Sequence, residues 1–94
     1  MKLNFEWDEK KARDNLKNHK ISFDEAVTVF SDPLSITIPD PEHSEDEQRH
    51  VGIGVSSRGR VLVVVHTESK GNVRIISCRK ATPRERRVYE EANH

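Results

Sequence analysis

The sequence predicts an α+β domain in which two N-terminal helices pack on an antiparallel sheet of three or four strands and a C-terminal helix follows. The first third of the chain repeats apolar residues at helical spacing, whereas the part after residue 33 alternates apolar and polar residues between turn signals. A length of 94 residues fits one domain, and no repeat or linker divides the segment 1–94.

Two helices are expected before residue 33, each after a capping residue. Asp8 is placed to cap a helix over 9–18, and Ser22 with Glu25 forms a capping box for a helix over 23–31. The Asp-Pro pair that follows breaks the second helix. Both helices are short, and each has one apolar side for packing.

The rest of the chain predicts strands and a last helix. The expected strands cover residues 34–38, 48–56, 60–68 and 73–80, and Phe5-Glu6-Trp7 is a short strand or an extended lead-in. Turns are expected at 57–59 and 69–72. Thr82 and Glu85 form a second capping box, with proline at the first helical position, for a helix over 83–92.

Turn chemistry predicts the register of the two hairpins. A three-residue loop with Gly59 in the left-handed conformation fixes the first hairpin, and a two- or four-residue loop around Lys70-Gly71 fixes the second. The predicted pairs are Val51 with Val65, Ile53 with Val63 and Val55 with Val61, then Val65 with Ile76, Val63 with Cys78 and His66 with Ile75. A shift of one residue would exchange the two faces of a strand.

This register divides the sheet into an apolar face and a mixed face. The apolar face, expected under the two N-terminal helices, carries Val51, Ile53, Val55, Val61, Val63, Val65, Ile76 and Cys78. The mixed face carries His50, Gly52, Gly54, Leu62, Val64, His66, Ile75, Ser77 and Arg79. We expect the mixed face to form a shallow cleft. The alternative is that the last helix covers it.

The zero net charge hides two halves of opposite sign. Residues 1–47 contain 6 Lys+Arg and 12 Asp+Glu, giving −6, and residues 48–94 contain 10 and 4, giving +6. The acidic half ends in a loop expected over 39–47, and arginine dominates the basic half. An arginine-rich surface indicates a polyanionic partner. The other interpretation is that the acidic half folds back and neutralises the basic half.

Several classes of protein are excluded by composition. A single cysteine, Cys78, excludes an internal disulfide and a cysteine-built zinc site, and a buried structural thiol is expected. The longest apolar run, 61–65, is too short to cross a bilayer, and the first residues contain no apolar secretory stretch. A cytoplasmic protein without membrane contact is therefore expected.

Metal-free RNA cleavage is the chemistry that the mixed face suggests. The reaction needs a base for the ribose 2′-hydroxyl, a cation on the phosphate oxygens and an acid for the leaving 5′-oxygen. His66 could be the acid or base, Arg79 could hold the phosphate, and Tyr89 could add a contact. His50 beside His66 could bind a metal only if a carboxylate completed the site. Nothing else indicates one, so we expect no metal and no cofactor.

Several segments resemble the BrnT toxins, which are ribonucleases of bacterial type II toxin–antitoxin systems. The similar segments are Phe5-Glu6-Trp7-Asp8, residues 29–33, residues 38–40, residues 64–68, and the more specific block from Arg74 to Glu90. The resemblance implies a RelE-like fold, RNA cleavage that arrests growth, and neutralisation by a BrnA-type antitoxin that contacts operator DNA. Two departures are visible, Lys20 where glycine is expected and Cys78 where alanine is usual.

RelE-like enzymes often work with arginine, lysine and tyrosine, which widens the set of candidate residues. The expected catalytic residues are Arg79 and His66, followed by Tyr89, Lys80 and Glu85. The expected RNA-binding residues are Arg49, His50, Arg60, Ser77, Arg84, Arg86 and Arg87. An acidic or extended antitoxin segment is expected to cover the arginine-rich face. The alternative function is a non-catalytic partner-binding module, or an inactive toxin relic, that acts only with a DNA-binding antitoxin.

Overall fold

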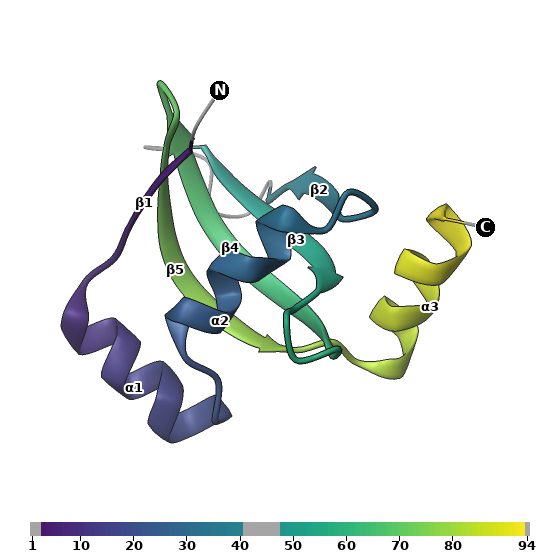
Figure 1. Ribbon diagram of the computed structural model, residues 1–94, viewed down its shortest axis with the longest axis horizontal. Coiled ribbons are helices and arrows are strands. Elements are labelled where there is room, and N and C mark those ends of the chain that lie inside the picture. The colour runs from purple at the N-terminus through teal and green to yellow at the C-terminus, as the bar shows by residue number, and fades with distance from the viewer. Residues whose placement is uncertain (1–2, 41–47, 94) are drawn as a thin grey trace.

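The computed structural model describes residues 3–40 and 48–93, which form an α+β fold (Figure 1). The elements are β1 (Asn4–Glu6), α1 (Glu9–His19), α2 (Phe23–Thr28), a 3₁₀ turn η1 (Val29–Ser31), β2 (Ile36–Pro39), β3 (Arg49–Val55), β4 (Val61–Ser69), β5 (Asn72–Lys80) and α3 (Pro83–Ala92). Most of the acidic loop expected over 39–47 lies outside the described residues. None of the described helices is long and apolar enough to cross a membrane.

The sheet is mixed and has five strands, in the order β1-β5-β4-β3-β2. The expectation of three or four antiparallel strands was therefore wrong in strand number and in one direction. β1 pairs in parallel with β5, with Phe5 opposite Val73, while the other three pairings are antiparallel. A three-residue strand is too short to show an alternating pattern, and α1 and α2 supply the crossover that parallel pairing needs.

The first turn of each α-helix is capped by the residue that the sequence predicts, although one capping box is incomplete. The side chain of Asp8 accepts from the backbone N–H of Lys10, and Thr82 and Glu85 form the full reciprocal capping box of α3. Ser22 accepts from the N–H of Glu25, but the side chain of Glu25 bonds to Ser56 and Arg60 of the β3–β4 turn instead of reaching back. The capping box predicted there is therefore only half formed.

A β-bulge corrects the predicted register of the second hairpin. The first hairpin is as predicted, with Gly59 at φ 78° and Val51 opposite Val65. In the second hairpin His66 lies opposite Ile75 as predicted, but a register shift follows, and Val65 lies opposite Ser77. The pairs predicted beyond that point, Val65 with Ile76 and Val63 with Cys78, are wrong. One inserted residue exchanges the faces of the rest of the strand.

The helices α1 and α2 cover the sheet face that was expected to be open. The core beneath them contains Ile21, Phe23, Ala26, Val29, Leu62, Val64, Val73, Ile75 and Cys78. Gly54 lies on this face, where a Cβ would come within 2.8 Å of the Cβ of Ser35 and 2.9 Å of Cγ1 of Val29. Gly54 therefore marks a close approach by the segment from η1 to Ser35 rather than a cleft.

Asn15 joins α1 to β5 at Cys78, beyond the residues of β5 that pair with β1. Its side-chain amide donates to the carbonyls of Ile21 and Cys78, at 3.0 and 2.8 Å, and its oxygen accepts from the N–H of Cys78 at 3.0 Å. These bonds satisfy strand groups that no neighbouring strand reaches. Cys78 is fully buried, as expected of a structural thiol, and burial raises its pKa to about 12.

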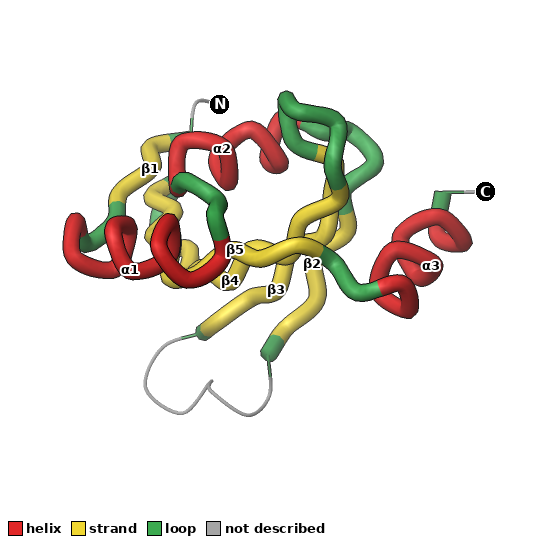
Figure 2. Tube along the Cα trace, turned by 90° about the horizontal axis from the view of Figure 1, so that it is seen from below, coloured by secondary structure: helices red, strands yellow, loops and turns green. Residues whose placement is uncertain are grey.

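The opposite sheet face is covered only in part. The helix α3 packs on it through Tyr89, and a smaller core forms there from Ile53, Val63, Ala81 and Tyr89. Figures 1 and 2 show α3 on the right, well separated from α1 on the left, with strands of the sheet between the two helices. The remaining sheet surface on that side is available for a functional site.

Candidate functional site

The structure places His66 inside the protein, away from Arg79. Its side chain is fully buried beneath the η1 segment, where its ring meets that of Phe30 edge-on at 4.8 Å. Arg79 lies opposite Val63, on the other side of the sheet. The prediction that these two residues share a face was wrong, because the bulge in β5 moves Arg79 to the side opposite His66.

His66 is part of a stacked histidine pair. His50 lies opposite it in β3, with ring centroids 5.6 Å apart, so the two rings are neighbours as expected. His66 contacts Oε1 of Glu68 through Nε2 at 3.2 Å, and burial lowers the pKa of its imidazole. His50 Nδ1 is buried and has no hydrogen-bond partner among the described residues. His66 is enclosed and offers RNA no direct contact, whereas the His50 side chain as a whole is half-buried.

Arg79 is held by a two-pronged ion pair with Glu85 of α3. The guanidinium nitrogens Nη1 and Nη2 donate to the two carboxylate oxygens at 2.7 and 2.8 Å. The hydrogen bond from Arg79 lowers the pKa of Glu85 to about 2, and the same bond raises the pKa of Arg79. The Arg79 side chain keeps 43% of its surface exposed. The pair therefore presents a fixed, accessible guanidinium where β5 meets α3.

Arginines and small hydroxyl residues on three neighbouring strands share this sheet face with Arg79. We call the exposed sheet face the group formed by Arg49, Thr67, Arg74, Ser77 and Arg79. Arg49, Thr67 and Arg74 form one row across β3, β4 and β5, and Ser77 and Arg79 lie further along β5. All five are half-buried or exposed. Adjacent strands are about 4.8 Å apart, so this spacing suits a chain of phosphates.

The register explains which of these residues the sequence analysis found. Arg49, Ser77 and Arg79 were predicted, and the structure brings them to one face. Arg74 and Thr67 were missed as site residues. The paired positions of Thr67 and Arg74 follow from the correct pairing of His66 with Ile75. What the sequence did not predict is that these two residues share a face with Arg79, because that depends on the bulge.

Tyr89 is buried and engaged by a carboxylate. Only 8% of its surface is exposed, and its hydroxyl donates to Oδ2 of Asp32 at 2.6 Å. That hydrogen bond raises the pKa of Tyr89 to about 12. The phenol therefore serves to dock α3 on the sheet, and it does not point at the exposed sheet face as a free acid.

A basic hollow lies at the end of the sheet, where the β3–β4 turn meets β5 and α3. It has a volume of about 300 Å³, and its lining residues are Gly59, Arg60, Val61, Lys80 and Arg86. Arg60 is held there by Glu25 through Nε and Nη2 at 2.8 and 2.6 Å. The predicted residues Lys80, Arg60 and Arg86 thus meet at one place, separate from the exposed sheet face. Arg84 and Arg87 are exposed on α3 and do not line the hollow.

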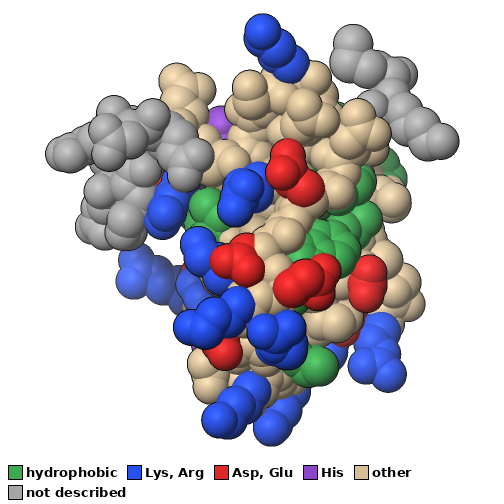
Figure 3. Space-filling model, turned by 90° about the vertical axis from the view of Figure 1, so that its left-hand side faces the viewer, with side chains coloured by type: hydrophobic (Ala, Val, Ile, Leu, Met, Phe, Trp, Pro, Cys, Tyr) green, Lys and Arg blue, Asp and Glu red, His purple; other side chains and the backbone are tan. Residues whose placement is uncertain are grey.

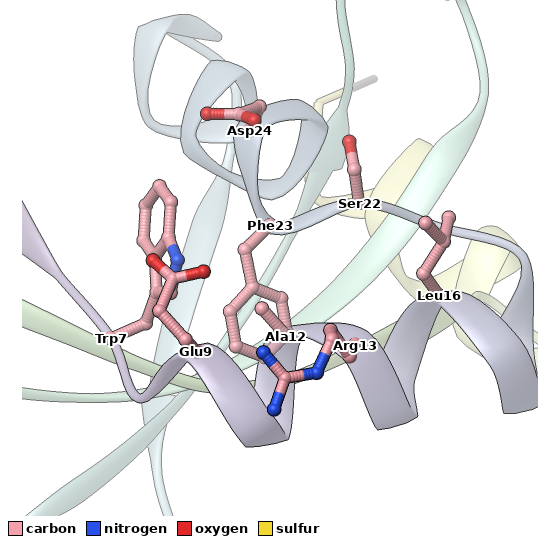
Figure 4. A pocket seen from close by; sticks show the side chains of 8 residues that line it. All are labelled: Trp7, Glu9, Ala12, Arg13, Leu16, Ser22, Phe23 and Asp24. Atoms are coloured by element: carbon pink, nitrogen blue, oxygen red, sulfur yellow. The ribbon is translucent and has the colours of Figure 1, made fainter.

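A second hollow, of about 240 Å³, lies between α1 and the start of α2 (Figure 4). Its floor includes Trp7, Phe23 and Leu16, and Arg13 and Asp24 lie among its polar lining. Figure 3 shows hydrophobic side chains on this side of the molecule next to acidic ones. Its apolar floor suits an apolar contact rather than a phosphate chain.

Known proteins share sequence features and the fold with this chain. The sequence profile of a family described as "Ribonuclease toxin, BrnT, of type II toxin-antitoxin system" matches residues 7–85. The chain is also similar to the 1.1 Å crystal structure of the Brucella abortus ribonuclease toxin BrnT, with a TM-score of 0.64 and 24% sequence identity. That match covers 87% of this chain and 97% of the other, and it shows a shared fold. No match was found among curated proteins.

Proposed function

Since this chain belongs to the BrnT family of ribonuclease toxins of type II toxin–antitoxin systems, we propose that it arrests growth by cutting RNA at the exposed sheet face. The observation that carries this proposal is the arrangement of Arg49, Arg74 and Arg79 on one uncovered surface. Guanidinium groups bind phosphate oxygens through paired hydrogen bonds. A single RNA strand that crosses the sheet at Arg49 and Arg74 and then follows β5 would reach Arg79.

In this proposal Arg79 binds the phosphate that reacts. Attack by the neighbouring 2′-hydroxyl places extra negative charge on the phosphate oxygens, and a fixed guanidinium stabilises that charge. Glu85 positions the guanidinium, since its carboxylate stays ionised at neutral pH and accepts hydrogen bonds from both Nη1 and Nη2 of Arg79. The cleavage is proposed to need no metal and no cofactor.

We assign no proton transfer to His66 or Tyr89. The imidazole of His66 is enclosed beneath the η1 segment, and the phenol of Tyr89 is bonded to Asp32. Water at the exposed sheet face would take the 2′-hydroxyl proton and protonate the leaving 5′-oxygen, and charge stabilisation by arginine would supply most of the rate.

A toxin of this class implies an antitoxin protein as its partner and RNA as its target. We propose that the antitoxin is of the BrnA type, that it covers the exposed sheet face with an acidic or extended segment, and that it alone contacts operator DNA. Complementary charge would speed the encounter and block RNA at the same time. A complex that leaves Arg79 open to solvent would contradict this proposal.

Purified protein and end-labelled RNA test the function directly. The reaction is run with a chelator present, and wild type is compared with Arg79→Ala and with Arg13→Ala, which removes an exposed arginine from α1. We expect cleavage by wild type and Arg13→Ala, and a loss of at least 100-fold in rate for Arg79→Ala. Circular dichroism checks that each variant is folded. Cleavage by folded Arg79→Ala at the wild-type rate would refute this site, and loss of all activity with the chelator would refute metal independence.

One observation favours a second candidate function, a non-catalytic partner-binding module or an inactive relic. In the described residues no group on the exposed sheet face titrates near neutral pH, and the guanidinium of Arg79 is already engaged by Glu85. This alternative predicts antitoxin binding without RNA cleavage and without growth arrest on expression. Inducible expression of wild type beside Arg79→Ala separates the two functions.

A further inference from the structure

The basic hollow contains cations that the proposed cleavage site does not use. Lys80 and Arg86 line it, and neither makes an ion pair within the described residues. Arg60 contributes a third cationic group, which Glu25 neutralises and holds in place. Among the described residues, no carboxylate lines the hollow. Two uncompensated positive charges therefore face a cavity of about 300 Å³, which is large enough for a phosphate group.

Three separate elements build the hollow. Gly59 and Arg60 belong to the β3–β4 turn, Lys80 is the last residue of β5, and Arg86 lies in the first turns of α3. The turn is fixed because Ser56 and Arg60 both bond to the buried carboxylate of Glu25. The turn side of the hollow is therefore preorganised, and anion binding has to order only the exposed side chains of Lys80 and Arg86.

The hollow and the cleavage site share the same two chain segments. Lys80 follows Arg79 in β5, and Arg86 follows Glu85 in α3. Arg79 and Glu85 meet at the exposed sheet face. Lys80 and Arg86 line the basic hollow at the adjacent end of the sheet. A polymer with regularly repeated negative charges can occupy both places at once, which a single free anion cannot do.

We propose that the basic hollow binds a backbone phosphate of the RNA strand, away from the phosphate that is cut. This inference rests on the proposed function and extends it to a second contact on the same substrate. Lys80 then acts as a binding residue rather than a catalytic one. The lining that the structure describes contains no aromatic ring, so the hollow is proposed to bind the backbone without selecting a base.

Binding of a short 2′-O-methyl oligoribonucleotide tests this proposal, since such an RNA lacks the attacking hydroxyl and stays intact. Affinity is measured over a range of salt concentrations for wild type, Lys80→Gln, Arg86→Gln and the double variant. Lys11→Gln/Lys17→Gln on α1 is the control with the same loss of charge. Each single substitution should reduce the slope of log affinity against log salt by about 0.7, and the double variant by twice that, whereas the control should not.

The outcomes separate this inference from the proposed function. If wild type binds the oligonucleotide and the hollow variants keep its salt slope, the hollow is not an RNA contact, although the cleavage proposal stands. If wild type neither binds nor cuts RNA, both fail. Weaker antitoxin binding with unchanged RNA binding would make the hollow a protein contact and overturn the inference. Stabilisation by inorganic phosphate as large as that by the oligonucleotide would make it a free-phosphate site, which also overturns it.

Discussion

The hydroxyl of Tyr89 and the carboxylate of Asp32 form a 2.6 Å hydrogen bond that joins α3 to the turn before β2, across 57 positions of sequence. The carboxylate also accepts from the N–H groups of Val55 and Leu34, both at 2.9 Å. Burial opposes ionisation of Asp32, but these three hydrogen bonds outweigh it and lower its pKa. One carboxylate therefore ties together α3, β3 and the turn after η1.

Tyr89→Phe removes one member of this group without changing the packing of the ring. We expect the free energy of unfolding to fall by about 1.5–3 kcal/mol, the range for hydrogen bonds to charged groups, and a urea titration measures it. RNA cleavage should continue at the wild-type rate at temperatures where the variant is folded. If folded Tyr89→Phe lost cleavage, the hydroxyl would have to be assigned to catalysis after all.

Glu85→Gln tests whether the ion pair restrains Arg79. Glutamine still fits the capping box of α3 but removes the charge that competes with phosphate for the guanidinium. We expect tighter binding of a 2′-O-methyl RNA together with slower cleavage, because Arg79 is freed but less well positioned. Thr82→Ala, which weakens the same cap while keeping the ion pair, is the control and should leave affinity unchanged. Weaker RNA binding by Glu85→Gln would contradict this role.

The same residue gives a stability that depends on pH. The pKa of Glu85 is lowered from 4.5 to about 2 by its hydrogen bond with Arg79, so the stabilisation is complete above about pH 4.5 and is lost as the pH falls towards 2. The difference in melting temperature between wild type and Glu85→Gln should therefore shrink over that window. A difference that stayed constant from pH 6 to pH 2.5 would show that the ion pair contributes nothing.

Local chemistry in the sequence predicted most of the elements, and the failures have one origin. Capping residues and the loop at Gly59 fixed helix starts and the first hairpin, because these signals act within a few residues. The bulge at the step from Val65 to His66 could not be predicted, since no turn or capping residue marks it. An apolar run on both faces of β4 also left no contrast to show which face the helices cover.

The candidate site was predicted in composition but not in arrangement. Arginine content alone indicated phosphate binding, and Arg79 and Arg49 do lie on one exposed surface. The expected partner of Arg79 was His66, yet the observed partner is Glu85, six residues along the chain. That pairing needs the turn between β5 and α3 to fold back, which no local pattern encodes.

His66→Phe examines the enclosed histidine. Phenylalanine can keep the edge-on contact with Phe30 and the stacking on His50, so cleavage of RNA should be unchanged. Burial lowers the pKa of His66 below 6.5, and the neighbouring His50 acts in the same direction while Glu68 opposes it. The unfolded chain therefore takes up a proton first as the pH falls, and the folded protein loses stability below about pH 6.5.

The measurement for this variant is the urea midpoint at pH 7.5 and at pH 5.5. From pH 7.5 to pH 5.5 the urea midpoint of wild type should fall further than that of His66→Phe, because the variant has no imidazole to protonate at this position. Equal losses would show that His66 does not titrate in folding. Loss of cleavage by a stable His66→Phe would return the imidazole to the active site.

Gly54→Ala against Gly52→Ala tests which sheet face the helices cover. A Cβ at Gly54 would meet side chains of Ser35 and Val29 at 2.8 and 2.9 Å, and overpacking of this kind costs about 1–3 kcal/mol in the free energy of unfolding. At Gly52 the nearest atom, Cε1 of His66, is 3.4 Å away, an ordinary contact. Alanine there should be neutral or stabilising by up to about 1 kcal/mol, because glycine weakens strands. Thermal or urea unfolding of the two variants gives the comparison. Equal stability would mean that no segment approaches β3 at Gly54, and the face assigned to RNA would have to be exchanged with the face under the helices.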